Sequence, residues 1–165
     1  RAAGQLALKA GVPVAAINDV VIWGNHANTM YPDVSQASVN GEAASGIYDT
    51  DWLRGDFLKV VSTRGKAIIE ARGASSAASA SSAAIDHMRD WWNGTGGRLV
   101  SMAIPSEGWY GVPEGLMFSF PCRVDESGNI TVDESFELDE FGRAKLADNI
   151  EALVGERSAV SDLLN

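Results

Sequence analysis

The chain has 165 residues, of which 45% are hydrophobic, and this is enough to build one well-packed domain. No apolar run approaches the roughly 18 residues that a membrane-spanning helix needs, so no membrane partner is expected. The formal net charge is −9, and residues 101–165 carry all of it with thirteen acidic and four basic side chains, which argues against binding to nucleic acid.

The N-terminal region is predicted to contain a helix followed by a strand. Residues 1–10 have helical composition, Gly11 ends the helix, and Pro13 follows it. No Ser, Thr, Asp or Asn precedes this helix to cap its first turn, and we therefore expect the chain to be a fragment whose natural start lies upstream. The β-branched residues of segment 19–23 then predict a strand.

A loop and a hairpin are predicted next. Residues 24–33 are small and polar for most of their length, and Pro32-Asp33 marks them as a loop. A short strand at residues 37–39 leads into Asn40-Gly41, a dipeptide that suits a tight hairpin turn.

Two long helices are predicted in the middle of the chain. Residues 49–51 can cap the first, which runs to about residue 72. Residues 71–84 are rich in Ala and Ser, but they run without a break into apolar residues at helical spacing and stop at Asn93-Gly94, so we reject a flexible linker. Their small side chains suit a tightly packed central helix, a helix–helix dimer contact, or a helix start that faces a ligand.

The C-terminal third is predicted to contain strands followed by one helix. The strands are expected at 99–104, 116–124 and 130–132. The helix begins near residue 139, and its apolar stripe extends to Leu164 with an interruption near Gly155. The whole pattern predicts an α+β fold with an antiparallel twisted sheet packed against long helices.

His26 is the strongest catalytic candidate in the sequence. It follows the predicted strand 19–23 and is framed by Gly24 and Asn25, an arrangement that presents an imidazole to a cleft. A plain surface histidine would have the same local sequence. The other histidine, His87, lies among charged residues within a predicted helix and is interpreted as solvated.

Other kinds of chemistry have little support in the sequence. Two distant histidines and one cysteine give no metal-ligand spacing, so no metal is expected. The glycines of segment 94–97 do not connect a strand to a helix and fail the dinucleotide fingerprint. Cys122 lies in an apolar run and is predicted to be buried and inert, and a single cysteine favours a reducing compartment.

Three segments resemble a known family. They are IWGNHANTMYPD (22–33), RGKAIIEARGASSAASASSAAIDHMRDW (64–91) and VSMAIPSEGWYGVPEGLMFSFPC (100–122). In order and spacing they resemble the C-terminal half of cytosolic-type malate dehydrogenases, in the lactate/malate dehydrogenase superfamily. The resemblance implies that residues 1–165 are the catalytic, substrate-binding domain and that the N-terminal dinucleotide-binding domain is absent.

The resemblance also implies roles for individual residues. His26 would be the proton acceptor, and Arg1 would hold the substrate's C1 carboxylate. Ser75 and Ser76 would lie near the nicotinamide and the substrate. The substrates would be malate and oxaloacetate, and the NAD cofactor would be bound mainly by the N-terminal Rossmann half.

The same resemblance implies that the chain is incomplete as an enzyme. The aspartate that orients the histidine and the mobile loop that selects malate would lie outside it, so we expect this chain alone to be inactive. A cytoplasmic homodimer is implied, with the Ala/Ser-rich segment and the Trp52 helix as candidate contacts. A non-enzymatic dimerisation or interaction module with the same fold, and a 2-hydroxy-acid dehydrogenase of lactate-type specificity, are the alternatives.

Overall fold

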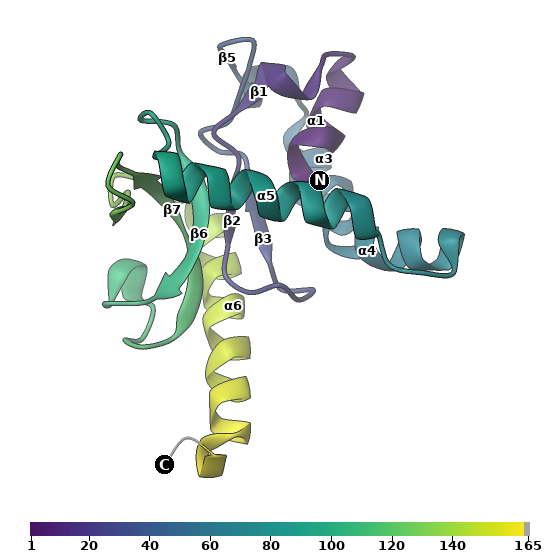
Figure 1. Ribbon diagram of the computed structural model, residues 1–165. Coiled ribbons are helices and arrows are strands. Elements are labelled where there is room, and N and C mark those ends of the chain that lie inside the picture. Colours follow the sequence, from purple (N-terminus) through teal and green to yellow (C-terminus); the bar gives the residue numbers. More distant parts are fainter. Residues whose placement is uncertain (164–165) are drawn as a thin grey trace.

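Consecutive groups of strands and of helices follow one another along residues 1–163, the part of the chain that this computed structural model describes (Figure 1). The helices are α1 (Ala2–Ala10), α2 (Ala44–Ile47), α3 (Thr50–Trp52), α4 (Leu58–Arg72), α5 (Ala77–Asn93) and α6 (Glu140–Ala159). The strands are β1 (Ile17–Asn18), β2 (Val21–Trp23), β3 (Tyr31–Asp33), β4 (Ser38–Val39), β5 (Glu42–Ala43), β6 (Val100–Pro105), β7 (Met117–Val124) and β8 (Ile130–Val132). The predicted α+β class is confirmed.

The described strands form three antiparallel sheets, in the orders β1-β4-β5, β2-β3 and β6-β7-β8. The predicted sheet is therefore divided into small sheets, with β7 at the centre of one of them. Asn40 and Gly41 join β4 to β5 with positive φ angles of 52° and 84°, the backbone that a two-residue hairpin turn requires. This predicted hairpin is confirmed.

The prediction that residues 24–33 are all loop is wrong at its C-terminal end, because Tyr31–Asp33 forms β3 and pairs with β2. Pro32 lies opposite Ile22 in this pair. The backbone of Ile22 bonds instead to two hydroxyl groups, because its N–H donates to Ser101 Oγ at 2.9 Å and its carbonyl accepts from Ser119 Oγ at 2.6 Å. A proline costs no ladder hydrogen bond at this position.

The long helix predicted from residues 49–51 is confirmed as a helical run from α3 to α4. The Asp49 side chain caps it by accepting from the Trp52 N–H at 2.9 Å, and a π-helical turn at Leu53–Phe57 joins the two helices. This helix ends at Arg72, as predicted, because Gly73 follows with a φ of 69°. The second predicted helix is also confirmed as α5, which begins at Ala77 and runs without a break to Asn93.

Tight packing of the Ala/Ser-rich segment is not what the structure shows. Helix α5 crosses the molecule without burying any of its residues. Its large apolar side chains are exposed, and Trp92 is 82% accessible. Small residues on α5 therefore face solvent within this chain, which leaves a partner contact or a ligand contact as the remaining interpretations.

Helix α6 is capped by Asp139, whose carboxylate accepts from the Gly142 N–H at 2.7 Å. The helix continues through Gly155 to Ala159, so the interruption predicted for its apolar stripe near Gly155 is not accompanied by a break in the backbone. The predicted stripe residue Leu164 lies outside the described residues. Within residues 1–163, no helix combines the length and apolar character needed to cross a membrane.

The main core surrounds Trp23 of β2, which is fully buried. Its indole N–H donates to the Asp33 carboxylate at 3.0 Å, and its ring meets that of Tyr110 edge to face at 4.8 Å. Cys122 is also fully buried and free, as predicted, and burial raises the pKa of its thiol to about 11. The thiol is therefore protonated at neutral pH.

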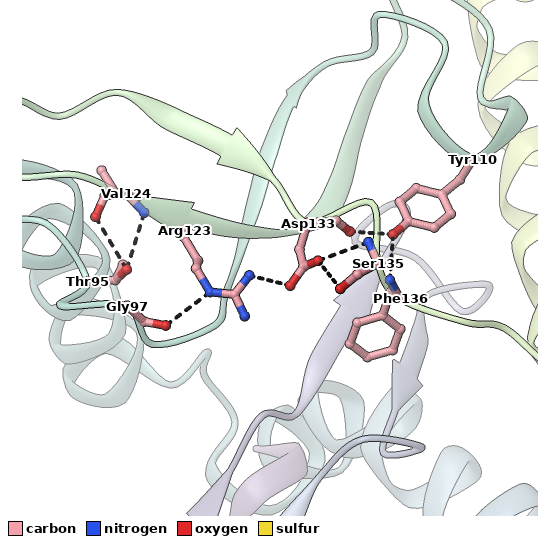
Figure 2. A network of polar contacts seen from close by, with 8 residues as sticks. All are labelled: Thr95, Gly97, Tyr110, Arg123, Val124, Asp133, Ser135 and Phe136. Carbon is pink, nitrogen blue, oxygen red and sulfur yellow. Dashed lines mark hydrogen bonds and ion pairs between the residues drawn. The ribbon is translucent and has the colours of Figure 1, made fainter.

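A polar network joins β7 to the segments that precede β6 and follow β8 (Figure 2). Arg123 of β7 donates to the Gly97 carbonyl at 3.0 Å and pairs with the Asp133 carboxylate. The Asp133 carboxylate accepts hydrogen bonds from the N–H and the hydroxyl of Ser135. The backbone carbonyl of Asp133 accepts a hydrogen bond from the Tyr110 hydroxyl. Since Tyr110 also contacts Trp23, the network supports the strand that leads to His26.

Candidate functional site

Strand β2 delivers His26 to the surface through Gly24. The backbone of Gly24 turns with a φ of 89°, and it exchanges two hydrogen bonds with Ser119 of β7, at 3.1 and 2.9 Å. The buried strand ends in this bridge, and the exposed His26 follows two residues later. The base of the histidine loop is thus fixed to the largest sheet.

The histidine loop, residues 24–30, is also closed on itself. The side chain of Asn25 bonds the Thr29 hydroxyl at 2.8 and 3.1 Å, and it accepts from the Ala27 N–H at 3.1 Å. The Met30 N–H donates to the Ala27 carbonyl. Asn side chains commonly stabilise such turns by bonding the backbone two residues onward, so the loop is held in one shape around His26.

The imidazole of His26 has no polar partner among the residues that the structure describes. Along residues 1–163 no hydrogen bond or ion pair engages its ring, and none joins it to Arg1 or Ser76. Both ring nitrogens are therefore available to accept or donate a proton to a bound molecule.

Arg1 and Ser76 are brought together although 75 positions separate them. A guanidinium nitrogen of Arg1 donates to Ser76 Oγ at 3.2 Å. Gly65 of α4 leaves room for this side chain, because a Cβ there would lie 3.2 Å from Arg1 Nη1. Two of the predicted site residues therefore meet between α4 and the start of α5.

The two predicted serines differ in their surroundings. Ser76 is buried and occupies the N-cap of α5, yet its hydroxyl accepts from Arg1 and does not cap the helix. Ser75 is exposed, and its carbonyl accepts from Arg72 at 3.3 Å. A guanidinium beside the N-terminus of a 17-residue helix provides positive charge and free N–H groups. This arrangement suits a carboxylate.

Asn149 of α6 is a site residue that sequence reasoning missed. Its buried amide contacts the histidine loop at Asn25 and Thr29. The available signal was an amide between Leu146 and Ile150 in the apolar stripe of a helix. Asn is a poor helix former and an unusual core residue, so its place in the stripe is informative.

The described part of the chain contains no cluster of side chains that is suited to bind a metal ion. No group of three or more His, Cys, Asp or Glu side chains is arranged there to hold a metal ion. The site instead provides an imidazole, that of His26, which is suited to acid–base chemistry, and a guanidinium, that of Arg1, which is suited to bind an anion.

Comparisons with known proteins agree with this chemistry. Residues 1–162 match the family model described as lactate/malate dehydrogenase, alpha/beta C-terminal domain. Malate dehydrogenase from Naegleria fowleri is 40% identical over 99% of this chain, with a TM-score of 0.92. Lactate dehydrogenase from Trichomonas vaginalis, solved with NADH and oxamate, is 37% identical over 99%, also with a TM-score of 0.92. The chain covers 50% and 52% of these two proteins, about half of their length.

Proposed function

The chain belongs to the lactate/malate dehydrogenase family, and from this premise we propose that it is the catalytic, substrate-binding half of an NAD-dependent malate dehydrogenase. In that reaction (S)-malate loses a hydride from C2 and a proton from its hydroxyl group and becomes oxaloacetate. The likeness to the Naegleria malate dehydrogenase, at 40% identity, supports malate as the substrate.

The meeting of Arg1 with Ser76 is the observation that carries this proposal. A single hydrogen bond at 3.2 Å anchors the guanidinium and leaves other N–H groups of its fork available. Two parallel charge-assisted hydrogen bonds from such a fork can hold the C1 carboxylate and fix the orientation of the substrate. The N-terminus of α5 adds favourable charge at the same place.

His26 would act as the acid–base group of the reaction. During malate oxidation its imidazole takes the hydroxyl proton, and C2 then becomes a carbonyl carbon as its hydride leaves. During oxaloacetate reduction the imidazolium returns that proton to the carbonyl oxygen. An exposed ring on a loop held in one shape fits a group that has to meet a substrate in a defined orientation.

NAD would supply the hydride acceptor of the reaction at its nicotinamide ring. We propose that Ser75 and Ser76, at the start of α5, line the side of the pocket nearest that ring. The rest of the cofactor would be held by an N-terminal Rossmann half. The Trichomonas relative, which was solved with NADH, supports this cofactor class.

A substrate comparison on an intact protein containing this chain and a Rossmann half tests the proposal. NADH oxidation is measured with oxaloacetate and with pyruvate, and we expect the higher kcat/KM with oxaloacetate. A preference for pyruvate would favour the lactate-type alternative, to which the Trichomonas relative gives weight. The absence of turnover with either would refute the dehydrogenase and favour the non-enzymatic module.

We further propose that the 165-residue chain alone is inactive, because the Rossmann half would supply most of the cofactor contacts. A sustained rate of NADH oxidation by the purified chain would overturn this.

The exposed apolar side chains of α5 are proposed as a contact for a second copy, forming a homodimer. The buried, unpaired Cys122 is compatible with the proposed cytoplasmic location.

A further inference from the structure

A fully buried polar side chain interrupts the apolar face of α6. Asn149 is 0% exposed, whereas the neighbouring stripe residues Leu146 and Ile150 pack in the core around Trp23. A buried amide strongly destabilises a protein unless its hydrogen bonds are made. Asn149 therefore has to be explained by what it binds.

Asn149 binds both ends of the histidine loop. Its Oδ1 accepts from the Asn25 N–H at 3.3 Å, on one side of His26. Its Nδ2 donates to the Thr29 carbonyl at 2.5 Å, on the other side. The second Nδ2 hydrogen bond goes to the Lys145 carbonyl at 3.0 Å and anchors the amide to its own helix.

These partners define the orientation of the amide. Two carbonyl acceptors face the Nδ2 group and one N–H donor faces Oδ1, so the reverse orientation would place like groups together. Asn25 and Thr29 are also joined to each other through their side chains. The loop and the helix therefore form one connected network around His26.

Gly24 makes this close approach feasible. A Cβ at Gly24 would lie 2.0 Å from Asn149 Oδ1 and 2.4 Å from its Cγ, so any larger residue would displace the amide. Gly24, directly after β2, and the helix that carries Asn149 are thus in direct contact beneath the loop. A side chain fitted this closely against the base of the loop is suited to hold it in a single position.

We propose that Asn149 is a positioning residue that sets the place of His26 by clamping both ends of its loop. This inference rests on the proposed function for its catalytic consequence. Asn149 acts through the loop backbone and does not touch the reacting atoms. A misplacement of about 1 Å at an acid–base group can cost on the order of 100-fold in rate, so such a clamp has catalytic value.

The first test measures amide hydrogen exchange by NMR in the 165-residue chain. The Asn25 N–H depends on Asn149, whereas the adjacent Gly24 N–H is held by Ser119 and serves as an internal reference. Asn149→Ala is expected to speed exchange of the Asn25 amide by about tenfold or more relative to Gly24. Leu146→Ala, a buried change one turn away on α6, should destabilise the helix and leave that ratio unchanged.

The second test measures steady-state kinetics of the intact enzyme with the same two variants. Asn149→Ala is expected to lower kcat by about 10- to 100-fold, since the acid–base group loses its alignment. The KM for the 2-hydroxy acid should stay close to that of the wild type, because Arg1 and Ser76 are untouched. Leu146→Ala should keep kcat close to the wild-type value even though it lowers stability.

The two experiments distinguish a failure of the Asn149 clamp from a failure of the proposed dehydrogenase function. Unchanged exchange at Asn25 in Asn149→Ala would overturn the clamp. A loss of protection with a kcat no lower than that of Leu146→Ala would overturn its positioning role. A wild-type intact protein without turnover would overturn the proposed function, and the exchange ratio would still decide whether Asn149 holds the loop.

Discussion

Replacing Gly24 by Ala is the sharpest test of how the histidine loop is built. Gly24 has a φ of 89°, a backbone conformation that L-residues rarely adopt, and its missing Cβ leaves room for Asn149. A methyl group would lie 2.0 Å from Asn149 Oδ1, so the amide has to leave its place. One small substitution therefore strains the backbone and also breaks the hydrogen bonds of the loop.

The size of the effect follows from these two contributions. The left-handed backbone costs about 1–2 kcal/mol for a residue with a Cβ. The displaced amide loses its three hydrogen bonds, each contributing about 1 kcal/mol, so Gly24→Ala should reduce the free energy of unfolding by about 4–5 kcal/mol. Asn149→Ala alone should cost about 3 kcal/mol by the same reasoning. The double variant should cost no more than Gly24→Ala alone, which gives a coupling energy of about 3 kcal/mol.

Urea unfolding of the three variants, followed by tryptophan fluorescence, measures this coupling energy. Gly155→Ala is the matched control, because Gly155 lies inside α6 with open space around its Cβ position. It should stabilise the protein by about 0.5–1 kcal/mol through helix propensity. Additive costs for Gly24→Ala and Asn149→Ala, or a cost of Gly24→Ala no larger than its backbone strain, would refute the reasoning.

Three further predictions concern the site and the polar network. In the intact protein His26→Asn should lower kcat by about 10²- to 10⁴-fold without lowering Tm, and a fall below about tenfold would exclude proton transfer by His26. Arg1→Lys keeps the charge but loses the fork, so the KM for the 2-hydroxy acid should rise about tenfold or more, and an unchanged KM would contradict the carboxylate role. Hydrogen bonds from Ser135 and the pair with Arg123 lower the pKa of Asp133 from its ordinary 3.8, so its stabilisation is present above that value and is lost as the pH falls through the folded pKa. Asp133→Asn should therefore flatten the acid limb of unfolding measured by circular dichroism, whereas parallel curves for the two proteins would contradict this role.

The sequence predicted correctly those elements that are stabilised by interactions between residues close together in the chain. The cap at Asp49, the turn at Asn40-Gly41 and the strand leading to His26 all depend on neighbours a few residues away, and each is seen in the structure. The strand at Tyr31–Asp33 was missed because a proline argues against a central strand. Pro32 is tolerated in this strand because the backbone of the opposite residue, Ile22, bonds two hydroxyl groups instead. These hydroxyl groups lie far along the chain, and no local pattern reveals them.

The site was predictable as residue types but not as an arrangement. His26 stood out by its setting, whereas the contact of Arg1 with Ser76 spans 75 positions and needs the fold to be seen. Asn149 carried only a weak signal, an amide within an apolar stripe. Its role depends on partners more than 100 positions away, at sequence separations of 120 and 124.

The long reach of these contacts has a consequence for folding order. Strands β2 and β3 are near neighbours in the sequence and can pair early, but hydroxyl groups 79 and 97 positions away bond the backbone of β2. The amide that clamps the loop lies farther still, in the last long helix. Contacts between distant segments close large loops and form slowly. During refolding, we therefore expect the immediate surroundings of His26 to become ordered among the last parts of the chain, after its helices and hairpins have formed.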